Sequence, residues 1–276
     1  MPAFPSLPYA DRARIVLALS IVLVLSAACS VKEDRRGCPC LLRLDFSEAD
    51  GRSRQGKLLL SAVSGDGFCR TDTLDMAEVQ DVYELQVPRG GVRVNLWSDD
   101  AGDFVGDDGL VIPFGDDCPP VLMYSAFAAT EGEVCTETVR LRKNYCRLTV
   151  ITDDEGGGYP FDLGVYGNVD GYDVEGRPRG GEFCHYLSAA GTDASGEDGG
   201  YVVLLPRQTD SSLMLDVMED AEVIKTFALG NYISQSGYDW LAPDLEDIAV
   251  RIDCACTRIV ISVGAWEHSY DVDIEF

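Results

Sequence analysis

Short stretches in which apolar and polar residues alternate constrain the fold of this chain more than any other feature of its sequence. Residues 40–46 are one example, and Gly-, Asp- and Pro-rich turns separate such stretches. A two-residue period is typical of a half-buried β-strand. Beyond the N-terminal region no stretch shows sustained helical periodicity, and only 74–79 and 245–249 can form a turn or two of helix. The sequence therefore predicts an all-β fold, typical of β-sandwiches.

The same criterion predicts two series of strands. The first comprises 40–46, 58–63, 82–87, 92–97, 121–127 and 136–142, with a turn at 64–67 and a hairpin across 88–91. The second comprises 145–151, 183–187, 201–205, 213–218, 223–229, 248–252, 258–263 and 270–276, and long acidic loops occupy 99–109, 153–159 and 191–200. A boundary near Lys143 and Asn144 gives two domains of normal sandwich size. We therefore expect an N-terminal β-sandwich at 38–143 and a C-terminal β-sandwich at 144–276.

The first 28 residues have the features of a secretory signal peptide. Arg12 and Arg14 precede an apolar run at 15–25 that is broken only by Ser20, and small residues follow. This order of a basic region, an apolar region and small residues is typical of a cleaved signal. The run has 11 residues, whereas a helix needs about 20 to span a bilayer. The segment is therefore not expected to be a permanent anchor.

A cysteine follows the small residues at the end of this signal. Residues 25–29 resemble the lipobox of bacterial lipoproteins, which implies cleavage after Ala28 and lipidation of Cys29. The alternative is an ordinary secretory signal whose cleavage leaves a cysteine nearby. We expect 29–37 to be a lipidated tether. The segment Lys32, Glu33 and Asp34 resembles the tag that directs lipoproteins of Bacteroidetes to the cell surface. The alternative is a plain solvated tether.

The charge of the chain excludes some partners. The formal net charge is −25, and removal of 1–28 takes away Arg12, Arg14 and Asp11, which changes it to −26. So acidic a protein cannot bind nucleic acid by neutralising phosphates, and an anionic lipid surface repels it. We therefore expect no nucleic-acid partner, and contact with a membrane only through lipid.

The cysteines indicate neither a metal site nor a complete set of disulfides. There are 10, and nine remain if Cys29 carries lipid, which leaves at least one unpaired thiol. The pairs Cys38/Cys40 and Cys254/Cys256 would each lie on one face of a strand. Four thiolates can bind zinc, but Cys-x-x-Cys loops are the usual ligands. We expect disulfides or buried thiols at these positions, with no metal and no other cofactor.

Catalytic signals are weak. The two histidines are His185 and His268, and we expect a structural role for both. Cys184 and His185 are neighbours in a predicted strand, so their side chains point to opposite faces and cannot form a dyad. The chain has no Gly-x-Ser-x-Gly motif. Residues 51–58 match the spacing of a P-loop motif up to the last position, where Leu58 cannot supply the hydroxyl that binds magnesium. The acidic loops lack EF-hand spacing. We expect no enzyme activity.

Several segments together resemble FimB-like fimbrial anchor lipoproteins of Bacteroidetes. The similar segments are 29–39 leading into 42–46, 87–91 before 94–97, 229–233, 237–240, 244–248, and 259–263 with Trp266. The resemblance extends over nearly the whole chain after Cys29. It implies two transthyretin-like Greek-key sandwiches without enzyme activity or a small-molecule substrate. It also implies a place at the base of a type V fimbrium, where the protein binds a shaft subunit, holds the fimbrium to the outer membrane and limits its length.

The N-terminal spacing favours an anchor over a shaft subunit. Shaft subunits of this kind carry a long N-terminal segment that a protease removes after an arginine. Here only eight residues separate Cys29 from Cys38. Cleavage at Arg35 or Arg36 would detach the protein from its lipid.

We expect the chain to join the fimbrium by strand addition, in which main-chain hydrogen bonds give affinity. The C-terminal segment 270–276 alternates cleanly. It can be a donor strand, or it can simply close its own sheet. The residues that alternate as a donor strand would are Tyr270, Val272, Ile274 and Phe276.

A surface glycan-binding lipoprotein is the alternative function. It would share the lipid tether and the sandwiches, and it would show exposed aromatic residues on a platform. The residues that can serve are Trp97, Tyr232, Tyr238 and Trp240.

Overall fold

The computed structural model describes residues 37–49, 51, 56–106, 109–153, 161–187, 200–253, 258–263 and 266–271. The chain divides into a segment Met1–Cys38 and a body Pro39–Phe276, and the body carries the fold. The predicted signal peptide and nearly all of the predicted tether lie outside the described residues. In the part of the chain that the structure describes, no helix has the length and apolar character needed to cross a membrane.

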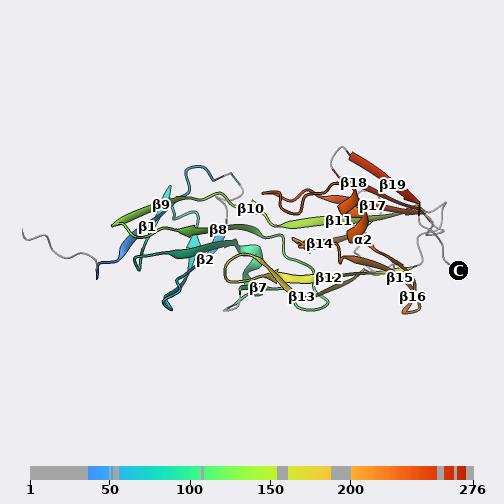
Figure 1. Ribbon diagram of the computed structural model, residues 1–276, viewed down its shortest axis with the longest axis horizontal. Coiled ribbons are helices and arrows are strands. Elements are labelled where there is room, and N and C mark those ends of the chain that lie inside the picture. Colours follow the sequence, from blue (N-terminus) through green and yellow to red (C-terminus); the bar gives the residue numbers. More distant parts are fainter. Residues whose placement is uncertain are drawn as a thin grey trace, which may run out of the picture. The chain divides into compact units, whose positions relative to one another are not determined.

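Two sheets, A and B, pack face to face in the first half of the body (Figure 1). Sheet A contains, in order, β4 (Val82–Val87), β1 (Cys40–Asp45) and β9 (Val134–Thr138). Sheet B contains β10 (Arg142–Lys143), β8 (Leu122–Ala128), β5 (Val92–Ser98), β2 (Lys57–Val63) and β3 (Cys69–Asp75). The core between them takes alternate residues of each strand, such as Leu42 and Leu44 of β1 and Leu58 and Leu60 of β2.

Sheets C and D form the second sandwich. Sheet C contains β16 (Glu222–Phe227), β15 (Met214–Glu219), β12 (Asp162–Tyr172), β7 (Gly109–Val111) and β6 (Val105–Gly106), and β13 (Pro178–Leu187) also pairs with β12. Sheet D contains β14 (Tyr201–Pro206), β11 (Tyr145–Asp153), β17 (Ile248–Asp253), β18 (Arg258–Val263) and β19 (Trp266–Asp271). The core between them includes Leu163 and Val165 from β12 and Ile259 and Ile261 from β18. The predicted all-β sandwich fold is confirmed.

The long strand β12 connects the two halves of the body. Its first residues pair with β15, whereas Gly171 and Tyr172 pair with β7. Gly171 has φ 141°, and a Cβ there would collide with the carbonyl of Leu110. Only glycine allows so close a backbone approach. Residues 105–111 thus belong to sheet C although they precede Lys143, and the division into domains at 143 stays a prediction.

The predicted hairpin across 88–91 is wrong. β4 pairs with β1 in sheet A, whereas β5 pairs with β2 and β8 in sheet B. The connection therefore crosses from one sheet to the other. Local turn chemistry at Pro88 and Gly90 allows a reversal, but it does not determine which strands then pair.

Several elements differ from the prediction. Neither 74–79 nor 245–249 is helical, and the α-helix in the part of the chain that the structure describes is α2 (Leu229–Gln235), at the end of a predicted strand. The strands β3 and β12 were not expected, because β3 is largely polar and β12 contains three glycines. The predicted loop at 99–109 contains a 3-10 helix, η2 (Asp99–Phe104), and β6. Contacts with distant strands determine these segments more than their own patterns do.

Candidate functional site

The predicted donor strand 270–276 begins inside β19. Among the described residues β19 pairs only with β18, in a register that places Tyr270 opposite Ile259. Its other edge therefore presents backbone N–H and C=O groups to which a further strand can bind. Tyr270 belongs to the sheet of this chain. The other proposed donor residues lie outside the described residues, and they are Val272, Ile274 and Phe276.

The helix α2 supports β19 through aromatic contacts. The ring centroids of Tyr232 and Tyr270 are 5.1 Å apart, and the Tyr270 hydroxyl donates to the Tyr232 carbonyl at 3.3 Å. α2 itself is held by the buried side chain of Ile233 and by Gly230, where a Cβ would collide with the backbone of Ser211. Burial raises the pKa of Tyr270.

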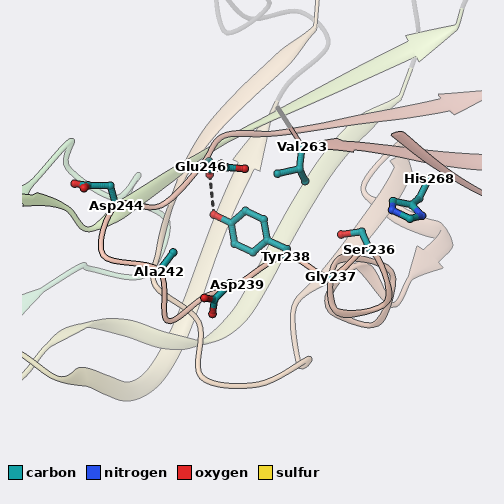
Figure 2. A pocket seen from close by; sticks show the side chains of 9 residues that line it. All are labelled: Ser236, Gly237, Tyr238, Asp239, Ala242, Asp244, Glu246, Val263 and His268. Carbon is teal, nitrogen blue, oxygen red and sulfur yellow. Dashed lines mark hydrogen bonds between the residues drawn. The ribbon is translucent and has the colours of Figure 1, made fainter. Parts of the chain in front are cut away.

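A cavity of about 510 Å³ lies beside β19 (Figure 2). Its walls come from the end of α2, the loop after it, β18 and β19, through Ser236, Gly237, Tyr238, Asp239, Ala242, Asp244, Glu246, Val263 and His268. The Tyr238 hydroxyl donates to the carbonyl of Glu246 at 2.7 Å, as the dashed line in Figure 2 shows. Burial raises the pKa of Tyr238. The cavity joins an aromatic wall to an acidic rim, and it can accept side chains of a strand at this edge.

Arg207 fixes the loop that forms one wall of the cavity. Its guanidinium donates to the carbonyls of Trp240 and of Ala242, the latter at 2.9 Å, and to the side-chain oxygen of Asn144 at 3.0 and 3.2 Å. The Arg207 backbone N–H donates to the Tyr172 hydroxyl at 2.9 Å, and that hydroxyl donates to the Asn144 carbonyl. Tyr172 is fully buried, and burial raises its pKa. This network joins β12, the end of β14 and the loop after α2.

Two aspartates fasten the same loop to β10 and to the start of β11. Asp244 accepts from the Arg142 guanidinium at 2.9 Å and from the Lys143 backbone N–H at 2.8 Å. Asp247 accepts from the Lys143 ammonium and from the Arg147 backbone N–H at 2.9 Å. Exposed ion pairs contribute up to about 1 kcal/mol each, but the backbone hydrogen bonds fix the position of the loop. The acidic rim is therefore partly engaged within the protein.

The residues considered for catalysis or metal binding do not converge. Cys184 is buried in β13, whereas the ring of its neighbour His185 lies 3.2 Å from the Gly115 carbonyl. Cys38 is exposed and precedes β1, whereas Cys40 is buried in it, so this pair does not share a strand face as expected. Within the described ranges no three His, Cys, Asp or Glu side chains are placed to hold a metal ion.

One residue of the expected glycan platform is in the core. Trp97 is 1% exposed, so the prediction that it can contact a glycan is wrong. Tyr232, Tyr238 and Trp240 are half-buried and pack against the core of sheets C and D. The rings of Tyr238 and Trp240 lie 4.6 Å apart. Tyr238 lines the cavity, Tyr232 supports β19 and Trp240 packs on Tyr238, so the three do not form an open platform.

The roles of Arg207, Asn144 and Tyr172 are not predictable from the local sequence. These residues lie 28 to 63 residues apart in the chain, and each stands at the end of a strand or between strands. A lone arginine after an alternating strand carries no local signal of the groups that it binds.

No family model matches the sequence, and no curated protein matches it. Solved structures do match. The fimbrial anchor protein Mfa2 from Porphyromonas gingivalis is 13% identical, with a TM-score of 0.58 over 84% of this chain and 100% of that chain. A candidate polysaccharide-binding protein from Bacteroides thetaiotaomicron is 14% identical, with a TM-score of 0.57 over 84% and 98%. A candidate adhesin from Bacteroides ovatus is 12% identical, with a TM-score of 0.56 over 87% and 97%. The chain thus has the fold of a fimbrial anchor, as its sequence resemblance predicted.

Proposed function

We propose that this chain is a surface lipoprotein that anchors a type V fimbrium to the outer membrane. The observation that supports the proposal best is the agreement of its fold with the whole of the Mfa2 anchor, at a TM-score of 0.58. In this proposal cleavage occurs after Ala28, acyl chains on Cys29 enter the membrane, and the tag Lys32, Glu33 and Asp34 directs the protein to the cell surface. Each buried methylene contributes about 0.8 kcal/mol, and two or more acyl chains make anchoring stable.

The body suits a mechanical role. A protein at the base of a fimbrium carries tension between its lipid and the shaft. The pairing of β7 with β12 and the Arg207 network with Asn144 and Tyr172 link segments far apart in the sequence. Tension on one end of the body is thereby distributed over several strands. No step in this role requires a catalytic residue, a cofactor or a small-molecule substrate.

We place attachment of the shaft subunit at the β19 edge. Tyr270 is fixed by Tyr232 and forms the root of the donor segment, which continues through Val272, Ile274 and Phe276. Main-chain hydrogen bonds would supply affinity there, and alternate side chains would supply specificity. The cavity beside His268 offers room for side chains of the shaft subunit that packs against this edge.

A cysteine substitution tests the anchor. In cells that carry Cys29→Ala, we expect assembled fimbriae to be released into the medium, because the protein then lacks its lipid. Cys38→Ala is the matched control: this thiol is exposed and lies nine residues further along, and its loss should leave fimbriae on the cells. Fimbriae that remain cell-bound in the Cys29→Ala strain would refute the proposal.

A further inference from the structure

The outer face of sheet C carries a row of side chains that crosses four strands. Tyr186 of β13 lies opposite Gly164 of β12, Gly164 lies opposite Asp216 of β15, and Asp216 lies opposite Thr226 of β16. Directly opposed residues in antiparallel strands share one face of the sheet. The four strands are labelled in Figure 1. The flanking residue Leu163 points into the core between sheets C and D, so this row faces away from that core.

Gly164 leaves a gap in the row, and an aromatic ring fills it. A Cβ at Gly164 would collide with the ring of Tyr166, so that ring lies over the glycine. The rings of Tyr166 and Tyr186 meet edge to face, with centroids 5.9 Å apart and planes at 88°. Tyr166 thus forms a floor and Tyr186, which is 51% exposed, forms a wall. Cys184 is fully buried beneath this pair.

Hydrogen-bonding groups lie beside the aromatic corner. The Asp216 carboxylate accepts from the Thr226 hydroxyl at 2.6 Å, which fixes its position in the row. Burial raises the pKa of Tyr166. The surface therefore places the exposed ring of Tyr186 beside a half-buried ring, a carboxylate and a hydroxyl group, within one row and its neighbour.

A loop holds the outer edge of β13 in place. The Gly115 N–H donates to the Cys184 carbonyl at 2.9 Å, and the His185 ring lies 3.2 Å from the Gly115 carbonyl. Tyr186 follows His185 directly. The backbone of β13 next to Tyr186 is therefore hydrogen-bonded to β12 on one side and to this loop on the other. The corner is thus formed on regular, supported strands.

We propose that this corner of sheet C is a binding site for a neutral pyranose residue of a polysaccharide. A sugar ring has an apolar C–H face, which packs on an aromatic ring, and a rim of hydroxyl groups. Donation of sugar hydroxyls to a carboxylate gives short, charge-assisted hydrogen bonds. The Asp216 carboxylate in the row and the net charge of −25 both repel uronates and other anionic sugars, which favours a neutral glycan as the ligand. This site is separate from the β19 edge and does not depend on the proposed anchor function.

Polysaccharide binding by the full-length protein tests the site. Affinity electrophoresis and calorimetry with a β-glucan, an α-mannan and a galactan should show binding of at least one, and polygalacturonate should not bind. Tyr186→Ala should weaken binding by about tenfold, from the loss of one stacking contact, and Asp216→Asn should weaken it as well. Phe127→Ala, on β8 and 61% exposed, is the control and should bind as the wild type does.

Three results would overturn the proposal. The first is that none of the neutral polysaccharides binds. The second is that Tyr186→Ala, shown to be folded by circular dichroism, binds with wild-type affinity. The third is that Tyr186→Ala leaves glycan binding intact but loses binding to a fimbrial subunit, which would make this face a protein interface. A Tyr186→Ala strain should keep its fimbriae attached, so failure here is distinct from failure of the anchor.

Discussion

The Tyr172 hydroxyl provides a test of how the body is held together. Tyr172→Phe removes one buried oxygen and leaves two buried backbone groups without their partner: the Arg207 N–H, now bonded at 2.9 Å, and the Asn144 carbonyl. Water cannot readily replace the hydroxyl, because Tyr172 is 0% exposed. A buried polar group without a partner costs about 1–3 kcal/mol. With two such groups, we expect the free energy of unfolding to fall by about 2–6 kcal/mol.

Tyr201→Phe is the matched control for this substitution. Tyr201 is also buried, at 4% exposure, but its hydroxyl makes one long hydrogen bond, to the Phe161 carbonyl at 3.3 Å. Its loss should cost less than about 1 kcal/mol. Urea unfolding followed by tryptophan fluorescence measures both, and the midpoint should shift while the m-value stays unchanged. If Tyr172→Phe is no less stable than Tyr201→Phe, the network does not hold the body together.

Three further predictions concern the strands. Gly171→Ala should destabilise the protein by at least about 3 kcal/mol in urea unfolding, because the backbone is left-handed and the neighbouring carbonyl cannot move away. Gly180→Ala is the control: its added Cβ meets open space, so its stability should be close to that of the wild type. The hydrogen bond from the Tyr83 hydroxyl at 2.5 Å lowers the pKa of Asp72. The resulting stability is complete above the unfolded pKa of about 3.9 and is lost as the pH falls through the lower folded value. The difference in free energy of unfolding between wild type and Asp72→Asn should therefore be constant above about pH 5 and shrink in acid. A difference that stays constant down to about pH 2 would show that the Tyr83 hydrogen bond does not stabilise the ionised Asp72. Deletion of 272–276 should abolish binding of the shaft subunit without a change in the thermal midpoint, and a truncated protein that still binds the subunit would exclude the donor strand.

The sequence predicted the strands that alternate and missed those that do not. Residues 40–46 and 258–263 keep a strict two-residue period, because one face of each strand meets a core, and both are strands in the structure. β12 was missed because Gly164 and Gly171 interrupt its pattern. Those glycines are explained only by distant contacts, with Tyr166 in one case and with Leu110 in the other.

Strand pairing and the candidate site were harder to predict. The turn after Val87 allows a hairpin, yet β4 and β5 belong to different sheets, because the choice of partner depends on the packing of whole sheets. The C-terminal alternation pointed to the β19 edge. The cavity beside it depends on Arg207 and Asn144, which are 63 residues apart, and no local pattern links them. Trp97 was predicted to be exposed and is buried. An aromatic residue in a strand lies more often in the core than on the surface.

In our proposal, lipid on one thiol holds an all-β body at the cell surface. Metabolic labelling with an alkyne analogue of palmitate, followed by mass spectrometry of the N-terminal peptide, measures this lipid on the protein itself. We expect label on Cys29 in the wild type and in Cys38→Ala, and none in Cys29→Ala. An unlabelled wild-type protein, or label that persists in Cys29→Ala, would refute the lipid anchor.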